Sequence, residues 1–253
     1  MNNYIIGIAG NKNAGKDTIA NMINYIFKRG VTKASYADWA LQKAKLYNLQ
    51  DRIIHFADAN KDILSMLFSI DRIYFDSRQY KDIEYYNLDT GNFVNPVVVE
   101  HDKRWRIITI DMLKEHSLNY IVKHNDSTYN TKFNAIKLRT LLQYFGTEIC
   151  RNQLGDDIWI KTTMNKATRI ANSRRICIIA DVRFANEADR IRCVNDLPLY
   201  GRVVKIVRNN DKTDNNDKHE SEQGINNYDY LIENNGSLMQ LFYKVLDIIQ
   251  QIV

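Results

Sequence analysis

The N-terminal part of the chain combines a strand pattern, a glycine-containing turn and a helix pattern, and no other feature constrains the fold as strongly. Residues 4–9 form an apolar run that predicts a buried strand. Residues 18–28 carry apolar side chains at helical spacing and predict an amphipathic helix. The turn between them, residues 10–18, reads GNKNAGKDT. A strand that leads into a helix through such a turn is typical of α/β proteins built from βαβ units.

The turn has the residue types of a phosphate-binding P-loop. Gly10 and Gly15 allow backbone conformations that other residues avoid, so that successive N–H groups can point inward at phosphate oxygens. The helix N-terminus adds about half a positive charge, and Lys16 adds a full charge at the β- and γ-phosphates of a nucleotide. The expected ATP-binding residues are Gly10, Asn13, Ala14, Gly15, Lys16, Asp17 and Thr18. The alternative is a glycine-containing turn that binds nothing.

The residue after Lys16 departs from the usual P-loop pattern, in which a Ser or Thr at that position binds Mg²⁺. Here Asp17 follows the lysine and Thr18 comes next. Two interpretations stay open: Asp17 holds the metal through a water molecule, or Thr18 takes part of the role. Asp17 and Thr18 are therefore the candidate metal ligands.

Similar patterns along the rest of the chain also favour an α/β fold. Further strands are expected at residues 52–56, 175–180 and 202–207, and further helices at 136–151 and 237–252, the last with Ser237 as N-cap. This alternation predicts a mainly parallel sheet flanked by helices. We expect one domain over residues 1–253, with an insertion at about 71–134 on the acceptor side. Irregular stretches are expected at residues 88–103, 123–134 and 209–217.

A second group of candidate residues lies in the predicted helix 136–151. Arg139, Gln143, Thr147 and Arg151 follow one another at intervals of four, which places them on one helix face. Guanidinium groups bind phosphate oxygens through two parallel hydrogen bonds, so this face could hold an anionic ligand. Gly146 weakens a helix and indicates close approach of a ligand or another backbone. A solvated helix face explains the same spacing equally well.

A third group follows the predicted strand 175–180. Asp181 comes directly after it, then Arg183 and Glu187. Ligands of open α/β sheets bind beyond the carboxyl ends of the strands. In an extended chain Asp181 and Arg183 face the same side, where the aspartate would orient Mg²⁺ or its waters and the arginine would neutralise charge on a transferred group. The alternative is an internal ion pair between Asp181 and Arg183.

The amino-acid composition favours some classes of function over others. The net charge of +5, from 35 basic and 30 acidic residues, suits a small anionic ligand and is too weak to favour nucleic-acid binding. Three cysteines without metal-type spacing fit a reducing compartment. No signal peptide or membrane span is recognised, so we expect a soluble, cytoplasmic protein. His55 and His101 suggest no role, and His219 belongs either to a nucleotide-contacting turn or to a polar helix start.

Taken together, these segments resemble the deoxynucleoside monophosphate kinases of bacteriophages and large DNA viruses. The similar segments, in chain order, are residues 15–18 (GKDT), 56–58 (FAD) with Lys61, 138–143 (LRTLLQ), 146–148 (GTE) with Arg151, 157–159 (DIW), 181–184 (DVRF) with Asn186 and Glu187, and 219–222 (HESE). Asp-Thr after the P-loop lysine is expected in such a family. Residues 71–134 match no segment of it.

The resemblance implies the nucleoside monophosphate kinase fold and the conversion of a deoxynucleoside monophosphate and ATP to the diphosphate and ADP with Mg²⁺. The implied catalytic residues are Lys16, Arg139, Asp181 and Arg183. The implied substrate-binding residues are Lys61, Arg139, Gln143, Gly146, Thr147, Arg151, Trp159, Asp181, Arg183 and Glu187. Trp159 would stack on a base, although a single tryptophan is more often a packing residue. A homodimer is compatible with the resemblance.

Two other functions stay open at this point. The GKDT turn by itself also fits another small-molecule kinase on the same core, such as a phosphomevalonate or dephospho-coenzyme A kinase. A protein that binds nucleotide to switch or assemble is the third possibility, although no switch motif is recognised. The sequence does not reveal which base, or which sugar, an acceptor would carry.

Overall fold

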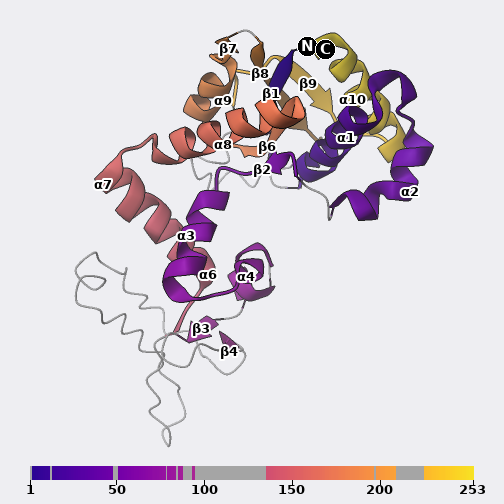
Figure 1. Cartoon of the computed structure of the whole chain (residues 1–253). Coiled ribbons are helices and arrows are strands. Elements are labelled where there is room, and N and C mark those ends of the chain that lie inside the picture. Colours follow the sequence, from indigo (N-terminus) through magenta and orange to yellow (C-terminus); the bar gives the residue numbers. More distant parts are fainter. Residues whose placement is uncertain are drawn as a thin grey trace, which may run out of the picture. The chain divides into compact units, whose positions relative to one another are not determined.

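The computed structural model describes residues 2–11, 13–47, 51–77, 79–83, 85–87, 93–94, 135–196, 198–208 and 225–253. The chain divides into two compact units, one formed by Met1–Phe56 with Ile160–Val253 and the other by Ala57–Trp159 (Figure 1). The second unit is thus one continuous stretch between the two parts of the first. It begins before and ends after the insertion expected at residues 71–134. That the chain acts as one kinase domain stays a prediction.

A mainly parallel sheet forms the centre of the first unit, as predicted. In spatial order its parallel strands are β2 (Ile53–Ile54), β6 (Ile176–Val182), β1 (Asn3–Ala9), β8 (Leu199–Val207) and β9 (Tyr230–Glu233). The short strand β7 (Asn195–Asp196) pairs antiparallel with the start of β8. The chain therefore has an α/β architecture, which is consistent with the nucleoside monophosphate kinase fold implied by the resemblance.

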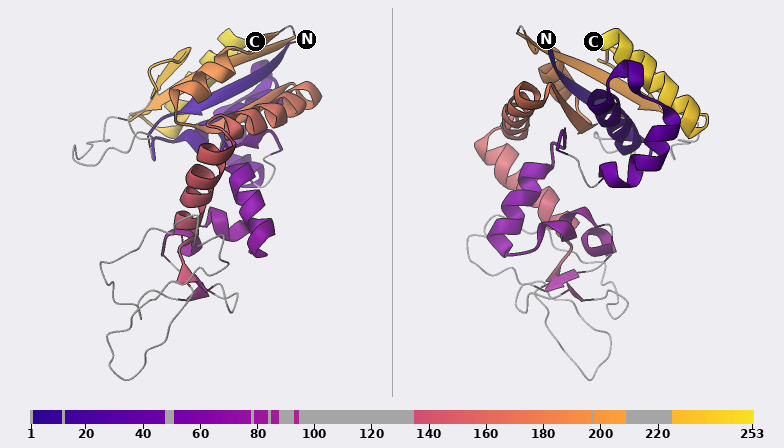
Figure 2. Two further views of the ribbon diagram at one scale, coloured as in Figure 1. Left: turned by 90° about the vertical axis from the view of Figure 1, so that its left-hand side faces the viewer. Right: turned by 45° about the vertical axis from the view of Figure 1, so that its right-hand side comes forward.

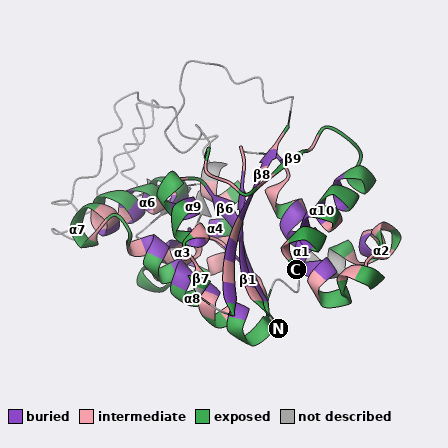
Figure 3. Ribbon diagram, turned by 90° about the horizontal axis from the view of Figure 1, so that it is seen from above, coloured by how far each residue is buried: buried purple, intermediate pink, exposed green. Residues whose placement is uncertain are grey.

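Helices cover both faces of this sheet (Figures 2 and 3). On one face lie α1 (Lys16–Arg29), α2 (Tyr36–Tyr47) and α10 (Leu238–Ile252), with the short helix η1 (Val31–Lys33) between α1 and α2. On the other lie α8 (Ile158–Arg174) and α9 (Ala185–Arg192). Ile6 of β1 packs into the first core and Ile5 into the second, because side chains alternate along a strand. Burial on both faces explains the continuous apolar runs in the sequence.

The second unit has its own small core. Helices α3 (Asp58–Phe68), α4 (Arg72–Asp76) and α6 (Leu138–Tyr144) pack around Leu64, Phe75 and Leu141. The strands β4 (Phe93–Val94), β3 (Tyr85–Asn87) and β5 (Ala135–Ile136) form an antiparallel sheet in that order. The other elements among the described residues of this unit are η2 (Gln79–Ile83), η4 (Phe145–Arg151) and α7 (Asn152–Leu154).

The predicted terminal helices agree well with the structure. The helix expected at residues 18–28 is α1, which begins at Lys16, and the helix expected at 237–252 is α10. Ser237 is its N-cap, as predicted: its Oγ accepts from the backbone N–H of Gln240, and the side chain of Gln240 accepts from the N–H of Ser237.

The prediction of one regular helix over residues 136–151 is wrong in its second half. The α-helix α6 ends at Tyr144, and Phe145–Arg151 form the wider turns of a π-helix, η4. The N–H of Asn152, for example, donates to the carbonyl of Thr147, five residues back. The strand β9 was not predicted, because only one of its four residues is buried and no clear alternation results.

Candidate functional site

The glycine-containing turn lies between β1 and α1, in the strand–turn–helix order that the sequence predicts. At Gly10 an added Cβ would lie 2.5 Å from the carbonyl oxygen of Ile206 in β8, so only glycine lets the turn approach that strand. At Gly15 the backbone has φ 108°, a region that side chains disfavour. The two glycines therefore act in the turn as expected from their positions.

The ammonium of Lys16 lies against the backbone of this turn. Its Nζ donates hydrogen bonds to the carbonyls of Gly10 and Asn11, with N–O distances of 2.6 and 2.7 Å. Gly15, the N-cap of α1, has no side chain that could accept from the first N–H groups of the helix. Backbone donors at a helix start, together with a lysine, are the groups that bind phosphate in P-loops. The residues of the turn are therefore compatible with the predicted binding of an anion.

Asp17 and Thr18 stand in the first turn of α1. The side chain of Asp17 is 78% exposed, and Thr18 is half-buried. Their carboxylate and hydroxyl oxygens are the hard ligands that Mg²⁺ prefers, and this metal commonly takes only one or two carboxylates beside nucleotide phosphates. The residues present therefore fit Mg²⁺. That Asp17 or Thr18 holds this metal stays a prediction.

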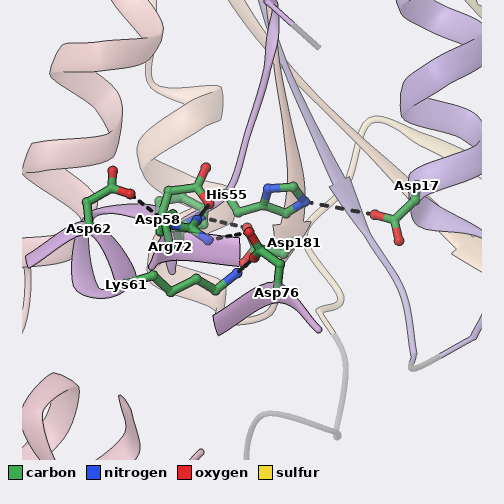
Figure 4. A network of polar contacts seen from close by, with 9 residues as sticks. Asp17, His55, Asp58, Lys61, Asp62, Arg72, Asp76 and Asp181 are labelled. Carbon is green, nitrogen blue, oxygen red and sulfur yellow. Dashed lines mark hydrogen bonds and ion pairs between the residues drawn. The ribbon is translucent and has the colours of Figure 1, made fainter. Parts of the chain in front are cut away.

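His55 lies beside the first turn of α1, a position that the sequence analysis did not predict. It follows β2, and its Nε2 lies 3.9 Å from Oδ1 of Asp17 (Figure 4). The neighbouring residue Phe56 donates its backbone N–H to Oδ1 of Asp181, at 2.8 Å. Three segments far apart in the sequence thus meet beside the start of α1. No local pattern around His55 signals this, because the contact depends on the order of the strands.

Asp181 is buried, with 8% of its surface exposed, and lies near the carboxyl end of β6. The pairing of β6 with β1 shifts at this point: Gly7 pairs with Ile179, but Ala9 pairs with Val182. Ala180 accordingly packs into one core and Val182 into the other, although they are two residues apart. Such bulges redirect side chains and are common next to active sites.

Asp181 and Arg183 were expected on the same side because residues two apart in a regular strand face the same way. The bulge interrupts this alternation, so the expectation no longer follows. Asp181 is buried, whereas Arg183 is exposed, and the two form no ion pair with each other among the described contacts. Glu187 is 2% exposed, and its Oε2 accepts from the backbone N–H groups of Arg183 and Phe184, at 2.8 and 3.2 Å. Its carboxylate therefore caps α9 and fixes the backbone that carries the arginine.

The other acceptor-side candidates lie in the second unit. Arg139, Gln143 and Thr147 are exposed, and Arg151 is half-buried. Because the π-helix begins at Phe145, an interval of four residues no longer places side chains in one row beyond that point. The single polar face expected for the four residues is therefore supported only for Arg139 and Gln143.

Gly146 and Trp159 contact each other through the indole. Trp159 is 5% exposed, and its Nε1 donates to the carbonyl of Gly146 at 2.9 Å. A Cβ on Gly146 would lie 2.6 Å from Nδ2 of Asn60, so the close approach is made by a side chain rather than by another backbone. These contacts favour the packing interpretation of Trp159.

Lys61 is held in a charged cluster on α3 and α4 (Figure 4). Its Nζ lies 2.8 Å from Oδ1 of Asp76, and its side chain is 14% exposed. Arg72 contacts the other oxygen of Asp76 and also Asp62 and Asp58, the latter two at 2.7 and 3.0 Å. The cluster holds α3 against α4 and orders the lysine.

Some predictions fall on other parts of the chain. His101 and His219 lie outside the described residues, as do residues 123–134 and 209–217, and residues 88–103 apart from β4. No helix in the described ranges is long and apolar enough to cross a membrane.

Comparisons with known proteins agree with the resemblance found in the sequence. A family model described as deoxynucleotide monophosphate kinase matches residues 4–245. The deoxynucleoside-5'-monophosphate kinase of Escherichia phage T5 is 23% identical over 87% of this chain and 84% of its own length. The deoxynucleotide monophosphate kinase of Escherichia phage RB69 is 23% identical over 97% and 99%. An Acanthamoeba polyphaga mimivirus protein named for the same activity is 30% identical, over 43% of this chain and 58% of its own.

Proposed function

Because this chain belongs to the deoxynucleotide monophosphate kinase family and is therefore a nucleotide kinase, we propose that it transfers the γ-phosphate of ATP to a deoxynucleoside 5'-monophosphate, giving the diphosphate and ADP. The observation that carries the proposal is the turn between β1 and α1, with the Lys16 ammonium against its backbone. The family match favours this function over another small-molecule kinase or a nucleotide-binding switch.

The turn binds the donor in this proposal. Backbone N–H groups of the turn and of the first residues of α1 take the phosphate oxygens, and Lys16 moves its ammonium from the carbonyls of Gly10 and Asn11 to the β- and γ-phosphates. Asp17 and Thr18 would hold Mg²⁺, which when bound neutralises charge on the phosphates.

Asp181 and Arg183 act on the transferred group. Asp181 lies at the carboxyl end of β6, where sheet proteins of this type bind ligands, and its second oxygen can accept from a metal-bound water. The exposed guanidinium of Arg183 neutralises charge that develops in the transition state. Glu187 keeps the Arg183 backbone in place through its two backbone hydrogen bonds.

Residues of the second unit bind the acceptor. Lys61, Arg139 and Arg151 supply positive charge for its phosphate, since ammonium and guanidinium groups pair with phosphate oxygens. Gln143 and Thr147 offer exposed hydrogen-bonding groups for the sugar or base. Gly146 lets the π-helical turn lie against Asn60. Arg139 is also the candidate catalytic residue on this side.

A coupled assay of ADP formation tests the proposal directly. Purified protein is mixed with ATP, Mg²⁺ and each of dAMP, dCMP, dGMP and dTMP in turn. We expect turnover of at least one acceptor, with the matching diphosphate as product. A folded protein that binds Mg·ATP and phosphorylates none of the four would overturn the proposal.

We further propose that the enzyme works in the cytoplasm on free nucleotides, without a nucleic-acid or membrane partner. The weak excess of positive charge supports small anionic substrates. The homodimer, which is compatible with the resemblance, stays a prediction that light scattering of the purified protein would test.

A further inference from the structure

The chain beyond β9 reaches the phosphate-binding turn at a residue that no motif marks. Asn234 follows β9 directly, and its backbone N–H donates to the carbonyl of Val207, at 2.8 Å, at the end of β8. Its side-chain Nδ2 donates to the carbonyl of Ala14, also at 2.8 Å. The two residues of this second bond are 220 positions apart in the sequence.

The acceptor of this bond lies between two residues with positive φ. Asn13 and Gly15 have φ values of 66° and 108°, and the buried Ala14 stands between them. Asn13 is one of few non-glycine residues in the described chain with positive φ, a conformation that persists only where surrounding contacts hold it. The hydrogen bond from Asn234 is such a contact.

Because the peptide unit is planar, this contact also sets the direction of a neighbouring N–H donor, that of Gly15. The carbonyl of Ala14 and the N–H of Gly15 belong to one planar trans peptide, so they point in opposite directions. A side chain that holds the Ala14 carbonyl therefore also fixes the direction of the Gly15 N–H, away from Asn234. The N–H groups of such a turn are the donors that bind phosphate.

Gly15 and Asn234 also depend on each other sterically. A Cβ on residue 15 would lie 2.8 Å from Nδ2 of Asn234, closer than such contacts allow. Glycine at this position thus serves the approach of the amide as well as the positive φ of the turn.

We propose that Asn234 is a positioning residue of the phosphate-binding turn: its amide holds the peptide between Ala14 and Gly15 so that the Gly15 N–H faces the nucleotide phosphates. The inference rests on the proposed function only in that the turn binds ATP. Asn234 need not touch the nucleotide, because it acts through the backbone.

Substitution of the side chain should leave the fold intact. The hydrogen bond from the backbone N–H of Asn234 to Val207 does not involve the side-chain amide. Helix α10 is capped separately, by Ser237. Asn234→Ala removes the donor, and Asn234→Leu replaces it with an apolar side chain of similar size. Asn226→Ala, at an exposed asparagine of the same unit, is the matched control. Thermal unfolding of all four proteins identifies a variant that fails to fold.

The test is calorimetric binding of two probes, Mg·ATP and magnesium tripolyphosphate, which shares the phosphates but lacks the nucleoside. We expect both Asn234 variants to bind each probe about tenfold more weakly than wild type, the effect typical of losing one hydrogen bond. The Asn226 variant should match wild type. In steady-state assays the KM for ATP should rise about tenfold and the KM for the acceptor less than twofold.

Two results would overturn the inference. Equal affinities of wild type and both Asn234 variants for both probes would show that the amide does not order the turn. Weaker binding of Mg·ATP with unchanged binding of tripolyphosphate would show that Asn234 contacts the nucleoside directly. Wild-type protein that binds both probes but phosphorylates no acceptor would contradict the proposed function and leave this inference in place.

Discussion

The side chain of Asp181 accepts a hydrogen bond from the backbone N–H of Phe56, with Oδ1 and N 2.8 Å apart. The bond joins the ends of the neighbouring strands β6 and β2. It fixes the chain next to His55, whose imidazole faces Asp17 at the start of α1 (Figure 4). The carboxylate of Asp181, which is expected to take part in the reaction, thus also holds the ends of two strands together.

Substitutions of Asp181 should separate these two roles. Asp181→Ala leaves the buried N–H of Phe56 without its acceptor and should lower the free energy of unfolding by about 1–3 kcal/mol. Asp181→Asn keeps an acceptor oxygen and should lose less than about 1 kcal/mol. Urea unfolding measures both. We expect kcat to fall strongly in both variants, because neither has the negative charge; near-normal kcat in Asp181→Asn would assign Asp181 a structural role alone.

Lys16→Ala should abolish most of the activity. Loss of a group that stabilises developing charge in a transition state costs roughly 10²–10³-fold in rate. Steady-state kinetics with saturating ATP give kcat, and circular dichroism confirms the fold. Lys33→Ala, which removes an exposed lysine shortly after α1, is the control and should behave as wild type. A Lys16 variant within tenfold of wild-type kcat would contradict the assigned role.

Lys61→Met should weaken binding of the acceptor and leave the donor unaffected. The ammonium is ordered by Asp76, so little entropy is lost when it meets a phosphate. We expect the KM for the deoxynucleoside monophosphate to rise about tenfold, as is typical of losing one charged hydrogen bond. The KM for ATP should stay within twofold. Asp62→Asn removes a partner of Arg72 but none of Lys61, and should change neither constant. Equal changes in both KM values would argue against an acceptor-side role.

Trp159→Phe tests whether this residue packs or stacks on a base. The variant loses the bond to the Gly146 carbonyl and should lower the free energy of unfolding by about 1–2 kcal/mol. Trp39→Phe is a matched control, because it also removes one indole hydrogen bond: Nε1 of Trp39 donates to Oδ1 of the buried Asn21 at 2.8 Å. We expect saturating acceptor to quench tryptophan fluorescence equally in wild type and Trp159→Phe. Quenching lost only in Trp159→Phe would indicate stacking.

The cysteines should differ in reactivity. Burial raises the pKa of the Cys177 thiol to about 12 and also raises that of Cys150, whereas Cys193 is exposed. The thiolate is the reactive form, so a thiol reagent at pH 8 should label Cys193 alone in the folded protein. Because the pKa of Cys177 in the folded protein lies above the ordinary value of 9.0, the stability that its neutral thiol contributes should be lost as pH rises from about 9 to about 12. Mass spectrometry of labelled peptides checks the first point; rapid labelling of Cys177 would contradict it.

Some of the site could be predicted because its signals are local. The strand 4–9, the turn with Gly10, Gly15 and Lys16, and the helix that follows are contiguous, and their side-chain periodicity indicates burial without knowledge of the fold. The N-cap Ser237 is likewise recognised within four residues, because its partner is the next turn of the same helix. The position of Asp181 near the end of a strand was predicted correctly.

The family, the α/β class with its mainly parallel sheet and the position of the glycine-containing turn could be inferred from the sequence alone, since each depends on residues adjacent in the chain or on motifs in fixed order. The contacts between distant residues at the turn and beside it are visible only in the folded structure: Asn234 with Ala14, His55 with Asp17 and Phe56 with Asp181. The tertiary structure also decided the bulge in β6 and the π-helical turn after Tyr144. The physical reason is that periodicity and capping are short-range properties, whereas these contacts arise from the order in which strands pair and helices pack.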